Sequence, residues 1–164
     1  MELQLRPSGR PSSSLRPSAP RVFDAAQFAV KDLRNRLMVF YSASAWARSR
    51  GSALWPEVAP ATAEIERSAE ALRATLQVLI SALEPSNDRD PQDLARNIVP
   101  EAARAVAEFL HRTERSMTSL RSGLTLCGTD GRELLADLED ALLHVRDAAF
   151  LLAASACRPS YPAP

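Results

Sequence analysis

Small and apolar residues recur at alternating steps of three and four through four long stretches of the chain. In the first stretch, from Phe23 to Arg50, they stand at positions 23, 26, 30, 33, 37, 40 and 44. This spacing places them on one face of an α-helix, because a helix returns to the same side about every 3.6 residues. We expect Asp24 to cap the start of this helix and Gly51 to end it.

The second stretch begins after Trp55 and runs to Leu83. Pro56 suits the first turn of a helix, since the N–H that proline lacks has no partner there. Pro60 lies one turn further on, which predicts a first turn that is irregular or separate. The residues predicted to be buried are Val58, Ile65, Leu72, Leu76, Leu79 and Leu83.

The third stretch has the clearest start, with Asp90 as the N-cap, Pro91 in the first position and Asp93 in the first turn. We expect it to reach about Leu126. Pro100 should kink or split it, because the ring removes one hydrogen bond and clashes with the preceding turn. Its predicted buried residues are Val99, Ala102, Val106, Phe109, Leu110, Thr113, Met117, Leu120 and Leu124.

The fourth stretch follows a short turn. Gly128 is expected to close the third helix, and Asp130 with Glu133 to form a capping box for the fourth. The fourth helix should stop at Arg158-Pro159. Its predicted buried residues are Leu135, Leu138, Leu142, Val145, Ala149 and Leu152.

Loops of about four to seven residues join these stretches, and loops that short make neighbouring helices antiparallel. We therefore predict an all-α fold, an up-down-up-down four-helix bundle over residues 22–158. Residues 1–21 and 159–164 are rich in Pro, Ser and Arg and are predicted to be disordered tails. Cys127 and Cys157 would lie at opposite ends of the last helix, which predicts two free thiols.

The charges are balanced in number but not in position. The 164 residues include 20 Lys and Arg and 20 Asp and Glu, for a formal net charge of zero. Residues 1–21 hold four Arg against Glu2, a balance of +3, which leaves −3 for the rest. We therefore expect no nucleic-acid partner. The longest strongly apolar run, Ala148 to Cys157, is about half of what a transmembrane helix needs, so no such segment is expected.

The N-terminal tail is open to three interpretations: a linker, a translocation signal or a regulatory arm. Its Arg- and Ser-rich, acid-poor composition resembles organellar transit peptides and is similar to type III secretion substrates. The chain is expected to be cytoplasmic or to be translocated through this signal. Ser13 lies three residues after Arg10, a spacing that basophilic kinases accept, and a phosphate there would reverse the local charge.

The two histidines are the candidates for metal chemistry. Glu108 and His111 have the Glu-x-x-His spacing of di-iron bundles, but on a helical wheel centred on Val106 both point to solvent. His144 has Asp140 four residues before it and no Glu three before it. We expect no metal and no cofactor. No nucleophile constellation, phosphate loop or small-molecule site is identifiable.

Two family resemblances involve His111. The segment from His111 to Leu120 is similar to a histidine phosphotransfer domain in its Leu nine residues after the His, with Glu114 and Arg115 where that family has Lys-Gly. The missing Gly argues against phosphotransfer, because the phosphoryl group needs a close approach.

The second resemblance is to HEPN ribonucleases, a helical family whose motif is Arg, four to six residues, then His. Arg104 and His111 match it at the longest spacing, with Ala105 where a polar residue is usual. The resemblance implies RNA cleavage by Arg104 and His111. The alternative is a solvated polar stripe that also includes Glu108 and Arg115.

Bulky apolar residues also lie opposite the predicted core. On the wheel of the first helix, Phe28, Val39 and Trp46 fall about 160–180° from Val30. Leu143 and Phe150 form a weaker set on the last helix. Exposed aromatic residues in a row are typical of partner or dimer interfaces.

The leading hypothesis is a non-catalytic interaction module, an adaptor or a secreted effector. It would bind another protein or a second copy through the outer face of the first helix. The alternatives are the HEPN-like ribonuclease and a coat protein for a hydrophobic surface.

Overall fold

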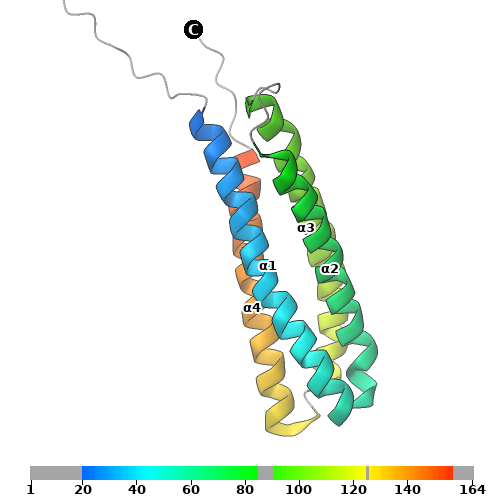
Figure 1. Ribbon diagram of the computed structural model, residues 1–164. Coiled ribbons are helices and arrows are strands. Elements are labelled where there is room, and N and C mark those ends of the chain that lie inside the picture. The colour runs from blue at the N-terminus through cyan, green and yellow to red at the C-terminus, as the bar shows by residue number, and fades with distance from the viewer. Residues whose placement is uncertain (1–19, 85–90, 125, 157–164) are drawn as a thin grey trace, which may run out of the picture.

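The computed structural model describes residues 20–84, 91–124 and 126–156, and all regular secondary structure in these ranges is helical. The four helices run alternately up and down (Figure 1), which confirms the predicted up-down-up-down bundle. The elements are α1 (Pro20–Leu54), the 3₁₀ turn η1 (Pro56–Val58), α2 (Ala59–Ala82), α3 (Pro91–Leu124) and α4 (Gly128–Ala156).

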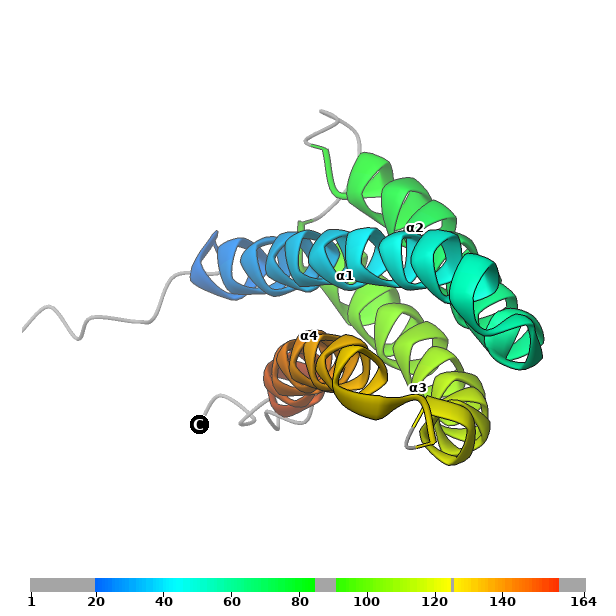
Figure 2. The ribbon, with the colours of Figure 1, turned by 90° about the horizontal axis from the view of Figure 1, so that it is seen from below.

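The helices form a ring in chain order. α1 packs against α2 and α4, and α3 packs against the same two helices, as the view along the bundle shows (Figure 2). α1 and α3 also meet across the centre. Phe40 of α1 and Phe109 of α3 make this contact edge to face, with ring centroids 5.6 Å apart.

Large apolar side chains from all four helices form one core. Every residue predicted to be buried in the second stretch, from Val58 to Leu83, is buried, which confirms its apolar face. Burying a Leu or Phe side chain contributes about 1.5–3 kcal/mol, so the shared core is the main source of stability. The largest fully buried side chains are Phe40, Leu33, Leu37, Ile65, Leu76, Leu83, Met117, Leu120, Leu124, Leu134, Leu138 and Leu152.

Both predicted ends of the first helix are wrong. α1 begins at Pro20 rather than at Asp24. At the other end, α1 continues through Gly51 to Leu54, and the Trp55 N–H donates to the Gly51 carbonyl at 2.6 Å. Gly51 is buried, and a Cβ on it would lie 3.4 Å from Val58 Cγ2. Gly51 therefore does not terminate the helix, and an alanine Cβ there would make an ordinary contact with Val58.

The prolines at the start of the second helix act as predicted. Pro56 opens the separate turn η1, and α2 follows with Pro60 in its first turn. Pro100 does not split the third helix, because α3 is continuous from Pro91 to Leu124. Pro100 is exposed, so its ring lies on the solvent side of α3 and not in the core.

Gly128 does not close α3 as predicted, because α3 already ends at Leu124 and Gly128 is the first residue of α4. The φ of Gly128, 74°, lies in the left-handed region, which a glycine adopts without strain. α4 starts at this same residue, so Asp130 lies inside the first turn and the predicted capping box with Glu133 is wrong. α3 ends at Leu124, two residues earlier than predicted.

Some predictions fall outside the described residues. These are the disordered tails, as far as they concern residues 1–19 and 157–164, the N-cap Asp90 and the thiol of Cys157. Cys127 is a free cysteine. None of the described helices is long and apolar enough to span a membrane.

Candidate functional site

The outer face of α1 carries a stripe of bulky apolar side chains, which we call the α1 stripe: Phe28, Val39 and Trp46. Their exposed fractions are 72%, 60% and 45%. The opposite face of the same helix packs into the core, where Val30, Leu33 and other residues are fully buried. α1 therefore has two apolar faces, of which the bundle covers one.

Ion pairs to the neighbouring helices show where the α1 stripe points. Arg48 pairs with Glu66 and so marks the side of α1 that faces α2. At about 100° per residue, the α1 stripe lies roughly 160–180° around the helix from Arg48. Arg50 lies within about 40° of the stripe and pairs with Asp130 of α4 at 3.6 Å. The stripe thus faces outward on the α4 side of α1.

The indole ring of Trp46 contacts the guanidinium group of Arg50. The guanidinium carbon of Arg50 lies 5.2 Å from the centroid of the Trp46 ring, which is within cation–π distance. The same guanidinium also pairs with Asp130. This arrangement limits the rotation of an exposed indole, so less conformational entropy would be lost if a partner covered the ring.

The two residues predicted on α4 form a separate patch. Leu143 and Phe150 are exposed and lie roughly 40–60° around the helix from Arg146, which pairs with Glu114 of α3 at 2.5 Å. They therefore lean toward α3. Leu151, which the sequence analysis missed, is 56% exposed and lies on the α1 side of α4. A helical wheel for α4 places Leu151 about 100° around the helix from Phe150 and would have assigned the two residues to different faces.

The predicted catalytic alternative is an exposed pair. Arg104 and His111 both lie on the outer surface of α3, two turns or about 10 Å apart along the helix axis. Neither residue lines either of the two hollows between α2 and α3 that are described next. The structure gives them neither a shared pocket nor a contact.

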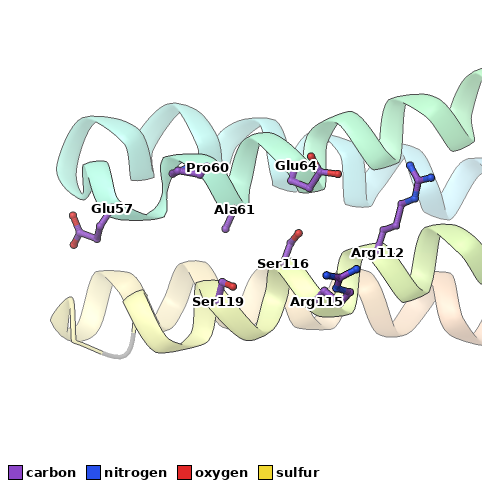
Figure 3. A pocket seen from close by; sticks show the side chains of 8 residues that line it. All are labelled: Glu57, Pro60, Ala61, Glu64, Arg112, Arg115, Ser116 and Ser119. Atoms are coloured by element: carbon purple, nitrogen blue, oxygen red, sulfur yellow. The ribbon is translucent and has the colours of Figure 1, made fainter.

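A groove that the sequence analysis did not predict runs between α2 and α3. It has a volume of about 530 Å³ and is open to solvent. Figure 3 shows acidic and small side chains on the α2 wall and basic and hydroxyl side chains on the α3 wall. The residues that line it are Glu57, Pro60, Ala61, Glu64, Arg112, Arg115, Ser116 and Ser119.

Much of the charge in the groove is already neutralised. Arg112 pairs with Glu108 at 2.5 Å, and Glu64 pairs with Arg67 at 3.0 Å. A second hollow of about 110 Å³ continues along the same seam, and the buried hydroxyl of Ser68 on its wall has no hydrogen-bond partner in the described chain. Because basic side chains on one wall face acidic side chains on the other, the groove favours neither an anionic nor a cationic ligand.

No other cluster of reactive side chains stands out in the described ranges. No three His, Cys, Asp or Glu side chains come together there as metal ligands would. The Cys127 thiol lies 3.2 Å from the Gly123 carbonyl, and burial raises its pKa, which lowers the thiolate fraction.

Comparisons with protein-family models, curated proteins and solved structures find no match for this chain.

Proposed function

We propose that this protein is a non-catalytic interaction module that binds another protein chain through the α1 stripe. The observation that carries the proposal is the exposure of Phe28, Val39 and Trp46 on a helix whose other face is completely buried. The core contains large side chains from all four helices, so stability does not require a second apolar face on α1.

The chemistry of the α1 stripe suits protein recognition. Trp and other aromatic residues dominate binding energies at protein interfaces, because they bury a large area at a small entropic cost. At about 1.5 Å per residue, the stripe spans roughly 27 Å from Phe28 to Trp46. This length suits a partner helix packed along α1.

The cellular role of such a module depends on the N-terminal segment. Its Arg-, Pro- and Ser-rich sequence supports either an adaptor that acts in the cytoplasm or an effector that is translocated to its target. In both cases the bundle supplies the binding surface.

The ribonuclease alternative makes a different prediction. It requires RNA to reach Arg104 and His111 on α3, whereas the interaction module requires a chain to cover α1. His111→Ala should leave protein binding unchanged, and no specific observation favours the ribonuclease.

A photo-crosslinking amino acid at Val39, in the cells that produce the protein, tests the proposal. We expect a covalent adduct with a protein chain, at a yield that Trp46→Ser reduces. The matched control is the same probe at Val78, an exposed apolar residue of α2, which should give no such adduct. Equal yields from both positions, or no adduct at Val39, would contradict the proposed function.

A further inference from the structure

We propose that the chain that covers the α1 stripe is a second copy of this protein. The two copies would be related by a two-fold axis roughly parallel to the bundle. α1 would then pack in register along α1 of the second copy and would also border α4 of that copy. This inference rests on the proposed function and names the partner of the same surface.

Charge complementarity between α1 and α4 is the first argument for a second copy. α1 contains six basic and two acidic residues, whereas α4 contains two basic and six acidic residues. Arg36, Arg48 and Arg50 pair with carboxylates of the same chain. Lys31 and Arg34 are therefore the described cations of α1 that are left to face α4 of a second copy. The opposite signs favour contact between α1 of one copy and α4 of the other.

The exposed carboxylates of α4 lie where such a contact needs them. Glu133, Asp140 and Asp147 follow one another at seven-residue spacing, roughly 100–140° around the helix from Arg146. They therefore face outward on the α1 side. Glu133 and Asp147 form no ion pair with any described residue, and Asp140 has only His144 at 3.6 Å. Within one copy these charges are left for solvent or a partner.

Leu151 extends the apolar surface across the seam between α1 and α4. Arg50 and Asp130 are level, because they form an ion pair. Phe28 lies about 33 Å from Arg50 along α1, and Leu151 lies about 32 Å from Asp130 along α4, at 1.5 Å per residue. Since α1 and α4 run antiparallel (Figure 1), Leu151 is level with Phe28. A helix laid between α1 and α4 would contact both.

The charges also select the direction of the axis. An axis perpendicular to the helices would lay α4 over α4 of the second copy, with their carboxylates opposed. An axis along the bundle instead places α4 of each copy beside the basic α1 of the other. It also brings Phe28, Val39 and Trp46 opposite the same residues of the second copy, as in a parallel coiled coil.

Sedimentation velocity of the full-length protein over a wide dilution series tests this arrangement. We expect a reversible dimer. Val39→Asp and Leu151→Asp should each weaken association by at least about tenfold, because each buries a charge without a partner in the interface. Val78→Asp, on an exposed site of α2, is the matched control and should leave the dimer unchanged. Circular dichroism checks that all variants remain helical.

Disulfide crosslinking tests the register. In a Cys127→Ser/Cys157→Ser background, the in-register dimer predicts that Phe28→Cys and Val39→Cys each crosslink to the same residue of the second copy. Crosslinking at Val39 alone would indicate an antiparallel pair and would overturn the arrangement. So would a dimer that Leu151→Asp leaves intact.

The two proposals fail in different ways. A protein that is monomeric at every concentration, but whose Val39 probe crosslinks to a different protein in cells, overturns the second-copy inference and leaves the interaction module standing. A Val39 probe that crosslinks to nothing overturns both.

Discussion

Two buried threonines show how differently the same side chain can be accommodated in one core. Thr62 Oγ1 lies 3.0 Å from the Ala59 carbonyl and 3.3 Å from the Val58 carbonyl. Thr113 is equally buried, but its hydroxyl has no hydrogen-bond partner among the described residues. Its hydroxyl loses the hydrogen bonds it would make with water and gains none in return.

We therefore expect Thr113→Val to stabilise the protein. The change removes an unsatisfied polar group and keeps the shape, so the free energy of unfolding in urea should rise by about 1–2 kcal/mol. Thr62→Val is the matched control and should lower it by about 0.5–1.5 kcal/mol, because a satisfied hydroxyl is lost. A loss of stability in Thr113→Val would show that its hydroxyl is bonded in solution.

Val58 packs against two glycines, one on each neighbouring long helix. A Cβ on Gly123 of α3 would lie 2.7 Å from Val58 Cγ1, too close for a stiff β-branched side chain to yield cheaply. Gly123→Ala should thus lower the free energy of unfolding by about 1–3 kcal/mol. Gly51→Ala meets Val58 at 3.4 Å and should be neutral or gain up to about 1 kcal/mol from helix propensity.

A double-mutant cycle identifies the contact responsible. If Val58 is the obstacle, Gly123→Ala combined with Val58→Ala should cost less than the sum of the two single changes. Additive costs would mean that the alanine at position 123 clashes elsewhere.

At the scale of the helix, Pro100 is the main local conflict in α3. The helix continues through it, so one backbone hydrogen bond is missing and the ring strains the preceding turn. Pro100→Ala should raise the free energy of unfolding, by up to about 3 kcal/mol. Pro60→Ala, in the first turn of α2 where no bond is lost, should change it little. Equal effects of the two changes in thermal unfolding would contradict this account.

The helices themselves could be predicted from the sequence because apolar spacing reports directly on burial. Their ends could not, because capping residues also occur inside helices. Gly51 is typical of a helix end, yet it lies within α1, which continues to Leu54. Asp130 is typical of an N-cap, yet it lies in the first turn of α4 and pairs with Arg50.

Of the candidate surfaces, too, one part could be predicted from the sequence and another part could not. The exposure of Phe28, Val39 and Trp46 follows from a single helical wheel. The place of Leu151 beside them depends on how α4 is rotated against α1, and the α2–α3 groove depends on the spacing of two helices. The rotation of α4 against α1 and the spacing between α2 and α3 each depend on two helices. The spacing of apolar residues along one helix therefore cannot predict them.

For the whole molecule, the formal net charge of zero conceals a strong separation of charge between helices. The basic α1 lies between α4, with its six acidic residues, and α2, which supplies Glu66 to Arg48. Exposed pairs of this kind contribute only about 0–1 kcal/mol each to stability. Their larger effect is on orientation, because they favour partners that bring an acidic face to α1.

The emission of Trp46 is the most direct test of the claim that a second copy of this chain covers the α1 stripe. The chain has two tryptophans, so Trp55→Phe leaves Trp46 as the only indole. We expect dilute protein to emit as an exposed indole that acrylamide quenches readily. Raising the protein concentration should shift the emission to shorter wavelength and protect it from quenching, and Val39→Asp should abolish both changes. Emission and quenching that stay constant at all concentrations, or a shift that survives Val39→Asp, would contradict the account.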